Sequence, residues 1–276
     1  MNSSLLSFIR GAVLILCEVL DLWKKELIAA VGGGGKTSIV FRLSRELLRL
    51  KKSVLLSTTT KMYFPRGNDI TVVIEDKKKS MFQKICNFYA GSGGDGNWDN
   101  GIVVIGKGVL PDNKIKGVER EILNEIFQRG LAEYIVVEAD GAKQKPIKVP
   151  APYEPVIPEK TTTVLGIVGI DAVGKPLTEE FFHRVEIAYR RLGYPYGKEM
   201  DEELIASVVT WEEGLFKNTP AAAKKVFILN KVDGKKERKQ AEKIAELVMM
   251  KRGKIIPERI VFTSVISENP VVEVFV

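Results

Sequence analysis

The stretch Ile28-Ala29-Ala30-Val31-Gly32-Gly33-Gly34-Gly35-Lys36-Thr37 decides how this chain folds. A short apolar run leads into four consecutive glycines and Lys-Thr, and the amphipathic stretch 38–50 follows directly. This order predicts a strand, a tight loop and a helix. Because glycine has no Cβ atom, the segment Gly32-Gly33-Gly34-Gly35 allows the backbone to curl closely around an anion, and the helix adds its unpaired N-terminal N–H groups. We therefore predict a loop that binds phosphate groups.

Lys36, Thr37 and Ser38 complete the predicted phosphate site. Lys36 supplies a cation for the β- and γ-phosphates of a nucleotide, the Thr37 hydroxyl suits Mg²⁺, and Ser38 opens the helix that faces the phosphates. Ala30 stands where the usual pattern of such loops has its first glycine, so the match is to the relaxed form. A flexible glycine linker before a lysine is the alternative, and the flanking strand and helix favour the phosphate loop.

The composition is that of a globular protein and argues against a nucleic-acid-binding protein and against a protein held by disulfides. Of the 276 residues, 45% are hydrophobic and 28% are charged, which suits one large α/β domain. The 42 basic and 35 acidic residues give a net charge of +7. Because the lysines lie in short, scattered groups without interleaved aromatic residues, solvated helix ends are favoured over nucleic-acid binding. Cys17 and Cys86 lie far apart, outside any zinc-site spacing, which indicates an interior without disulfides.

Residues 1–25 are predicted to form an amphipathic helix rather than a targeting segment. Between residues 5 and 22, apolar side chains recur at helical spacing. The charged residues within this run are Arg10, Glu18 and Asp21. The run has no basic leader and no clear cleavage site of small residues, so we expect neither a signal peptide nor a membrane span, and we expect a cytoplasmic protein.

Apolar runs alternate with helical patterns along the rest of the chain. This alternation is typical of a three-layer α/β fold of the P-loop NTPase-like type, with a mostly parallel sheet and helices on both faces. We expect one such domain over residues 26–276, with a glycine-rich loop at 91–101 and an irregular proline-rich segment at 144–160. The predicted strands are Glu26–Val31, Ser53–Ser57, Ile70–Ile74, Ile102–Ile105, Tyr134–Glu138, Thr162–Val168, Val226–Asn230 and, as the last one, Ile260–Ser264. The predicted helices are Thr37–Leu50, Ser80–Tyr89, Val118–Arg129, Thr178–Arg191 and Lys235–Lys251.

Polar residues follow the second predicted strand. In a mostly parallel sheet, ligands bind at the carboxyl ends of the strands. The segment Ser57-Thr58-Thr59-Thr60-Lys61 brings three threonine hydroxyls and a cation to that position, where they suit Mg²⁺, a water molecule or the γ-phosphate. Thr59 is the candidate for positioning the attacking water. A Ser/Thr cap at a turn is the alternative.

Two acids follow the apolar strand that ends near residue 138. Glu138 occupies the position at which a carboxylate orients Mg²⁺ or its water in phosphate-loop enzymes, so we pair it with Thr37 as a metal ligand. Asp140, before Gly141, is the second candidate for positioning the attacking water or a switch loop. A turn built by Asp-Gly is the alternative, and it accounts for Asp140 but not for Glu138.

The segment Asn230-Lys231-Val232-Asp233 follows another apolar strand. In this order, Asp233 suits the N1–H and 2-amino group of guanine, two donors that adenine does not present together, while the Lys231 stem packs on the base. Asn230 and Asp233 are therefore predicted to read the base and to favour GTP over ATP. A turn at the strand end is the alternative.

His183 is the single histidine of the chain, which argues against a site of several histidines. We predict that it lies on a helix with a structural role. Asp171, Lys175 and Arg184 lie near it in the sequence and are candidates for binding an acidic group.

Taken together, these motifs resemble the YqeC family. The resemblance spans about residues 26–265, and its most specific part is the acidic-to-proline passage 138–158. The other matching motifs are 31–37, 57–62, 169–177 and His183-Arg184. Where the family is expected to have histidine before Glu-Pro-Val-Ile-Pro, this chain has Tyr153, so a metal or acid–base role at that position is not carried over.

The resemblance implies an accessory role in the maturation of selenium-dependent molybdenum hydroxylases. The partner it implies is such a hydroxylase or its cofactor. Combined with the motifs, this gives Mg²⁺-dependent GTP binding and hydrolysis as the leading hypothesis, with Lys36 as the central catalytic cation. An ATP-dependent phosphotransferase or ligase and a module that binds a nucleotide or a cofactor without hydrolysing it are the alternatives.

Overall fold

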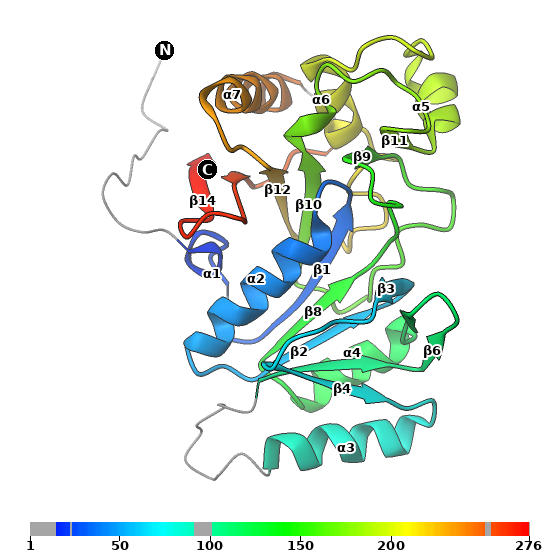
Figure 1. Cartoon of the computed structure of the whole chain (residues 1–276), viewed down its shortest axis with the longest axis vertical. Coiled ribbons are helices and arrows are strands. Elements are labelled where there is room, and N and C mark those ends of the chain that lie inside the picture. Colours follow the sequence, from blue (N-terminus) through cyan, green and yellow to red (C-terminus); the bar gives the residue numbers. More distant parts are fainter. Residues whose placement is uncertain (1–14, 23, 91–100, 252–254, 276) are drawn as a thin grey trace.

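A mostly parallel sheet forms the centre of the protein (Figure 1). The structure is a computed structural model that describes residues 15–22, 24–90, 101–251 and 255–275. Within these residues, nine strands run in the order β14-β13-β12-β10-β1-β8-β2-β5-β4, and β14 alone pairs in the antiparallel sense. Their bounds are β1 Glu26–Gly32, β2 Val54–Thr58, β4 Ile70–Ile74, β5 Ile102–Gly106, β8 Tyr134–Glu138, β10 Thr163–Gly169, β12 Lys224–Asn230, β13 Arg259–Thr263 and β14 Val271–Phe275.

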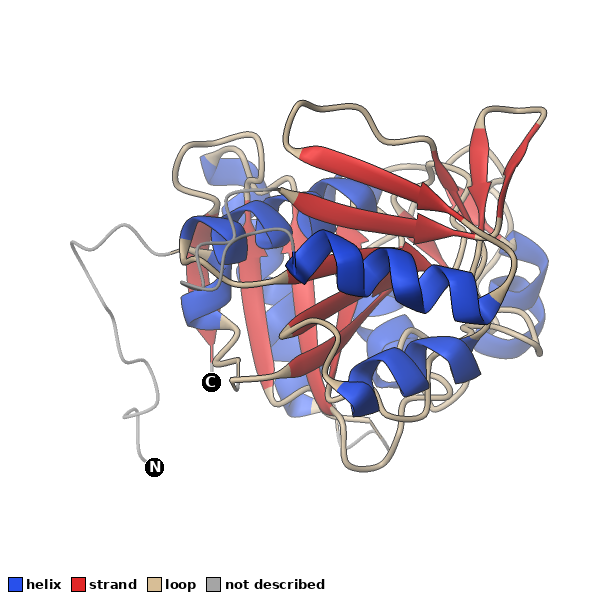
Figure 2. Cartoon of the chain, turned by 90° about the horizontal axis from the view of Figure 1, so that it is seen from below, coloured by secondary structure: helices blue, strands red, loops and turns tan. Residues whose placement is uncertain are grey.

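Helices cover both faces of the sheet and make it the middle of three layers (Figure 2). On one face, α1 and α2 pack on Ile28 and Ala30 of β1 and on their neighbours. On the other face, Leu27 belongs to a cluster with α3 and α4, while Ala29 and Val31 belong to one with α5, α6 and α7. Because both faces are covered, the central strands are continuous apolar runs rather than alternating ones. The helix bounds are α1 Leu16–Val19, α2 Lys36–Arg49, α3 Lys78–Ala90, α4 Arg120–Arg129, α5 Val185–Leu192, α6 Glu202–Thr210 and α7 Lys235–Met250.

Two small sheets follow the carboxyl ends of the central strands. The first has the order β3-β7-β6, with β3 at Lys61–Tyr63 directly after β2. Its other strands are β6 at Gly108–Leu110 and β7 at Lys114–Lys116. The second pairs β9 (Ile147–Lys148) with β11 (Phe182–His183) in parallel. A short 3₁₀ helix, η1 at Ile170–Ala172, follows β10.

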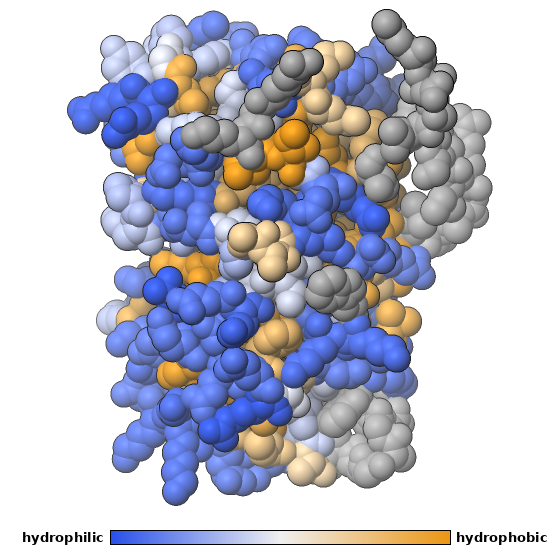
Figure 3. Space-filling model, turned by 180° about the vertical axis from the view of Figure 1, so that it is seen from behind, coloured by the Kyte–Doolittle hydropathy of each residue, from blue (hydrophilic) through white to orange (hydrophobic). Residues whose placement is uncertain are grey.

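The predicted fold class is confirmed: the chain forms a three-layer α/β structure with a mostly parallel sheet. Every predicted central strand is present, with ends that differ by at most two residues. The proline-rich segment 144–160 is irregular apart from β9. Seen from behind, hydrophilic residues cover most of the visible surface, with apolar residues in smaller groups among them (Figure 3).

Two predictions about the elements need correction. The helix expected over 178–191 is wrong in its first half: residues 178–181 form turns, residues 182–183 are β11, and only α5 is helical, because tertiary pairing with β9 overrides the local helical pattern. Ile260–Ser264 is not the last strand, since β14 adds an antiparallel edge to β13. Neither α6 nor the three-stranded sheet was expected.

Part of the predicted N-terminal helix lies outside the described residues. Of the run 5–22, the described part is helical at α1 only. The glycine-rich loop predicted at 91–101 also lies outside the described residues, apart from Gly101. No described helix is long and apolar enough to cross a membrane.

Candidate functional site

The glycine loop, Gly32–Gly35, joins β1 to α2 at the carboxyl edge of the sheet. Gly34 has φ +69°, and a Cβ atom there would lie 2.0 Å from the backbone nitrogen of Gly169. At Gly35, φ is +112°, and a Cβ atom would lie 2.5 Å from the side-chain nitrogen of Asn230. Neither position accommodates another residue without a shift of its neighbours, so the run of glycines follows from packing as well as from ligand approach.

The backbone N–H groups of this loop divide into two sets. Gly32, Gly33 and Gly34 donate inside the protein, to Asp140 Oδ2 at 3.1 Å, Ile167 O at 2.8 Å and Lys145 O at 3.0 Å. Among the described residues, no acceptor faces the next four N–H groups, those of residues 35–38. Unpaired N–H groups at the start of a helix attract anions. The available donors therefore begin at Gly35, later in the loop than the sequence suggests.

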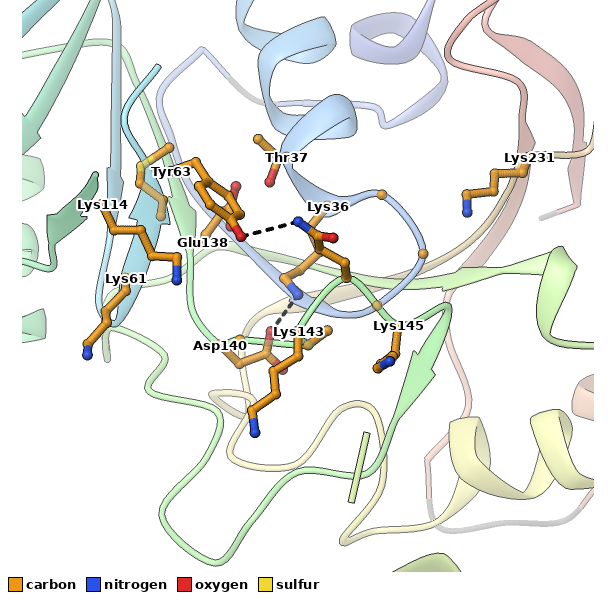
Figure 4. Close-up of a pocket in the computed structure, with 17 residues that line it drawn as sticks. Lys36, Thr37, Lys61, Tyr63, Lys114, Glu138, Asp140, Lys143, Lys145 and Lys231 are labelled. Atoms are coloured by element: carbon orange, nitrogen blue, oxygen red, sulfur yellow. Dashed lines mark hydrogen bonds and ion pairs between the residues drawn. The ribbon is translucent and has the colours of Figure 1, made fainter. Parts of the chain in front are cut away.

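Lys36 is nearly buried beneath the loop, with 6% of its side chain exposed. Its ammonium group donates to the carbonyl of Gly32 and lies 3.1 Å from Asp140 Oδ1 (Figure 4). The cation is thus held at the floor of the loop, next to the unpaired N–H groups.

Asp140 belongs to a buried ionic network that the sequence analysis did not predict. Its Oδ2 atom lies 3.0 Å from the Lys148 ammonium, which in turn lies 2.7 Å from Glu154 Oε2. Glu154 Oε1 also pairs with Arg184 at 3.0 Å. Burial raises the pKa of Glu154, but hydrogen bonds and charges from Lys148 and Arg184 outweigh it and hold the pKa below its usual value. Asp140 is therefore placed to orient the loop and its lysine.

Glu138 is a buried carboxylate with one oxygen that lacks a partner. Its Oε1 atom makes no hydrogen bond with the described residues. Burial raises the pKa of Glu138, while the charge of Lys36 and a hydrogen bond from the Thr37 side chain act against that rise. The exposed Thr37 side chain opens α2 on the same side of the loop (Figure 4). Two hard oxygen donors thus face the position beside the unpaired N–H groups.

A cavity of about 660 Å³ adjoins the glycine loop. Glu138 and Asp140 supply its acidic groups, and lysines from several elements supply the basic ones. Figure 4 shows Lys61, Tyr63 and Lys114 on one side of Lys36 and Lys231 on the opposite side. The lining lysines are Lys36, Lys61, Lys114, Lys143, Lys145 and Lys231.

A second cavity, of about 640 Å³, lies beyond Lys231 and shares that residue with the first. Asp171, Asp233 and Gln240 line it with Lys231. Asp233 Oδ1 accepts a hydrogen bond from Ser264 Oγ at 2.6 Å, and Lys231 Nζ lies 2.6 Å from Asp171 Oδ2. A carboxylate has several acceptor sites, so Asp233 keeps capacity for a ligand.

More than half of the sequence matches a known protein family. The family described as YqeC protein matches residues 28–186, which is more than half of the chain. The chain belongs to the YqeC family. The uncharacterized protein YqeC of Escherichia coli (strain K12) is 26% identical over 221 residues, which cover 77% of this chain and 80% of that protein.

The family match includes the glycine loop, both acids and the proline-rich segment but ends before the Asn230–Asp233 segment. In this YqeC family member, Asn230 itself is not part of a cavity wall. Its side chain is 1% exposed, donates to the Gly34 carbonyl at 2.8 Å and accepts from Thr263 Oγ1 at 3.0 Å. Asn230 therefore ties β12 and β13 to the glycine loop, whereas Lys231 and Asp233 line the second cavity.

The threonines after β2 hold neighbouring backbone rather than line a cavity. Thr58 Oγ1 donates to the Glu138 carbonyl at 2.9 Å, and Thr59 Oγ1 donates to the Val156 carbonyl at 2.8 Å. The structure therefore does not bring Thr59 to the wall where a nucleophilic water would be positioned. Lys61, the cation of the same segment, does line the cavity.

His183 and its neighbours are placed differently from the prediction. His183 lies in β11 rather than on a helix. Burial, followed by the charges of Lys148 and Arg184, lowers its pKa to about 4. Asp171 and Lys175 line the second cavity, while Arg184 pairs with Glu154, so the three candidates for an acid site do not converge.

Several site residues escaped the sequence analysis. Lys148 lies inside an irregular segment, where no periodicity marks it as buried. Tyr63, Lys114, Lys143 and Lys145 reach the cavity through long-range folding. Ser264 carried a local signal, since a hydroxyl at the carboxyl end of the predicted strand Ile260–Ser264 lies at the same sheet edge as Asp233.

Proposed function

We propose that this YqeC family member binds and hydrolyses a nucleoside triphosphate in the presence of Mg²⁺, with a preference for GTP. The observation that carries this proposal is the set of four unpaired N–H groups at residues 35–38, with the buried ammonium of Lys36 beside them. Four aligned donors and a cation at a helix N-terminus suit a chain of phosphates rather than a single carboxylate.

Lys36 acts on the β- and γ-phosphates in this proposal. In the structure, the Gly32 carbonyl and Asp140 hold its ammonium at the loop floor, so little reorganisation is needed when a polyphosphate arrives. Asp140 holds the lysine in place, while Lys148 compensates the charge of Asp140. The contribution to catalysis is positioning and electrostatic stabilisation of charge that develops during phosphoryl transfer.

The residues beside the loop fit a Mg²⁺ ion. Glu138 Oε1 is a buried oxygen without a hydrogen bond, and the Thr37 side chain adds a second oxygen donor. Among the described residues, no group of three or more His, Cys, Asp or Glu side chains could hold a metal ion by itself, so phosphate oxygens and water would complete the coordination, as is usual for Mg²⁺. Bound there, the ion would neutralise charge on the phosphates.

The second cavity supports the preference for guanine. Asp233 presents acceptor oxygens into it, and the Ser264 hydroxyl fixes the orientation of that carboxylate. Guanine presents two adjacent donors, N1–H and the 2-amino group, to such an acceptor pair. Because Lys231 borders both cavities, a nucleotide with its base beside Asp233 would extend its phosphates toward Lys36.

Hydrolysis of GTP by the purified full-length chain tests the proposal. We expect phosphate release that needs Mg²⁺ and that falls by about 100-fold or more in Lys36→Ala, since the lysine acts on developing charge. Glu138→Gln should raise the Mg²⁺ concentration required for half-maximal rate. Lys79→Ala, which changes an exposed lysine of α3, is the matched control and should keep the wild-type rate.

Four results would overturn the assignment or redirect it. Unchanged hydrolysis in Lys36→Ala would refute the site. Tight nucleotide binding without any phosphate release would favour a binding module, and turnover only with a second small molecule would favour a phosphotransferase or ligase. If ATP competed for the site as well as GTP does, the guanine preference would be refuted. Asn230–Asp233 would then be a turn that anchors the glycine loop.

The cellular role proposed for this activity is maturation of a selenium-dependent molybdenum hydroxylase. Family membership supports it, through the association that the resemblance implies. Cells that lack the chain should lose activity of such a hydroxylase while keeping the hydroxylase polypeptide. Wild-type chain should restore the activity, and Lys36→Ala should not. Full restoration by Lys36→Ala would separate the accessory role from nucleotide turnover.

A further inference from the structure

We propose that the part of the first cavity lined by Lys61, Lys114 and Lys143 binds a second ligand, a small polyanion with phosphate or carboxylate groups. It would lie next to the terminal phosphate of the nucleotide. The inference rests on the proposed function for this placement. It deepens that function by assigning a substrate class to surface that a nucleotide does not need.

The charge of the cavity is the first observation. Among the described residues, Lys61, Lys143 and Lys145 line the cavity and form no ion pair, whereas Lys114 pairs with Asp112 at 2.6 Å. Of the two acids in the wall, Asp140 is already compensated by two buried lysines. An excess of lysines over acids in a concave site attracts anions.

The arrangement of the walls is the second observation. Lys61 comes from β3 and Lys114 from the adjacent strand β7, while Lys143 lies in the segment that crosses the glycine loop. Gln144 Nε2, next to Lys143 in the chain, donates to Tyr63 Oη at 3.2 Å and so joins these two parts of the cavity wall. The crossing segment is itself fixed, because Lys145 O accepts from Gly34 N at 3.0 Å and Gly141 O accepts from Lys148 Nζ at 2.7 Å. The lysines are thus mounted on supported backbone.

The direction of the nucleotide is the third observation. Lys231 and the second cavity lie on one side of Lys36, and Lys61, Tyr63 and Lys114 lie on the opposite side (Figure 4). A nucleotide with its base in the second cavity therefore points its terminal phosphate toward the three-stranded sheet. The N–H groups of residues 35–38 and the ammonium of Lys36 already serve its phosphates, so the unpaired lysines Lys61 and Lys143 remain available for another anion.

The chemistry of the wall defines the ligand class. Lysine ammonium groups are point charges that bind phosphate and carboxylate oxygens alike. Tyr63 is half-exposed, and the Lys114 ammonium lies 4.9 Å from the centre of its ring, which leaves a flat apolar surface beside the charges. A small molecule with two or more anionic groups could contact these ammonium groups and the Tyr63 ring at the same time.

Calorimetric titration of the full-length chain tests the proposal. The protein is first saturated with Mg²⁺ and a non-hydrolysable GTP analogue, and inorganic pyrophosphate or citrate is then added. A blank titration into the same buffer removes the heat of Mg²⁺ chelation. We expect one of the two anions to bind to the nucleotide complex, and which one binds distinguishes phosphate from carboxylate recognition.

Matched double variants locate the binding. Lys61→Gln/Lys143→Gln should lower the affinity for the anion by about tenfold or more, as expected when charge-assisted hydrogen bonds are lost. The affinity for the GTP analogue should stay unchanged. Lys77→Gln/Lys79→Gln changes two exposed lysines next to and within α3 and should have no effect on either ligand. Binding should weaken with added salt.

The outcomes separate this inference from the proposed function. If the analogue binds but neither anion binds, or the anion binds equally to both double variants, the second site is wrong and the nucleotide site stands. Displacement of the anion by the analogue would also overturn the second site. If the analogue fails to bind while an anion binds through Lys61 and Lys143, the proposed function is wrong and the polyanion site stands.

Discussion

Lys148 and Asp140 form an ion pair of 3.0 Å whose side chains are only 1% and 2% exposed. The same carboxylate accepts the N–H of Gly32 at 3.1 Å, and the same ammonium pairs with Glu154 at 2.7 Å. The pair therefore connects the proline-rich segment to the first residue of the glycine loop. The glycine loop is therefore held in part by a lysine that lines neither of the two cavities.

Lys148→Met should destabilise the protein by about 3–5 kcal/mol, because it leaves the buried carboxylates of Asp140 and Glu154 without their shared cation. Methionine keeps most of the side-chain volume, so the loss of stability would come from the missing charge and not from an empty cavity. Urea unfolding of the full-length chain measures the change in the free energy of unfolding. Lys145→Met, in the same segment but without an ion pair, should change stability by less than about 1 kcal/mol. Similar values for both variants would contradict the role assigned to Lys148.

The elements of the sheet were predictable because each depends on local information. Tyr134–Glu138 and Ile70–Ile74 are apolar runs long enough for buried strands, and the glycines before Lys36 mark the loop. Helix α6 also had a local signal that was overlooked: Asp201 accepts from the Leu204 N–H at 2.9 Å, as an N-cap residue does. Its cap precedes an acidic first turn and an apolar run, the usual start of a helix.

The remaining features could not be read from local pattern. The two-residue strand at His183 exists through its pairing with Lys148 in another segment, and periodicity contains no record of such a contact. The same holds for the network of Asp140, Lys148 and Glu154, because two of its members lie in irregular backbone, the third lies in the two-residue strand β9, and charged residues are usually exposed. Glu138 and Asp140 could be recognised as candidate acids because they lie at or just after the end of a predicted strand. The residues that contact them come from distant segments and could be identified only from the folded structure.

Asn230→Ala should lower both stability and nucleotide affinity. The substitution leaves the buried carbonyl of Gly34 and the hydroxyl of Thr263 without their partner, at a cost of about 1–3 kcal/mol. Thermal unfolding and titration with a GTP analogue measure the two effects. Thr263→Val removes one of these bonds but keeps the contact with the loop, so it should reduce stability without a comparable loss of affinity. Unchanged affinity in Asn230→Ala would show that the loop keeps its shape without this anchor.

Asp233→Asn should lower the affinity for GTP by about tenfold or more. The amide replaces one acceptor oxygen with a donor, which would face the donors of guanine. Xanthosine triphosphate carries a carbonyl in place of the 2-amino group, so the variant should prefer it to GTP. Competition titrations with both nucleotides measure the change. Asp171→Asn, which alters only the partner of Lys231 in the same cavity, should keep the GTP preference. Loss of preference in both variants would point to a general effect of charge.

His183 should make the protein less stable as the pH falls from about 6.5 to about 4. Burial and the charges of Lys148 and Arg184 lower its pKa from 6.5 to about 4, so the unfolded chain takes up a proton that the folded chain refuses. Stability is therefore full above the unfolded pKa and decreases until the folded form is protonated as well. Because the ring is partly exposed, we expect a loss of no more than about 1–2 kcal/mol.

His183→Gln isolates this contribution, since every carboxylate titrates in both proteins and cancels in the difference. Urea unfolding of the two chains at a series of pH values gives the difference in free energy of unfolding. It should be constant above about pH 7 and should shift in favour of the variant as the pH falls toward 4. A difference that stays constant over the whole range would mean that His183 titrates alike in the folded and unfolded chains, and that Lys148 and Arg184 do not restrain it.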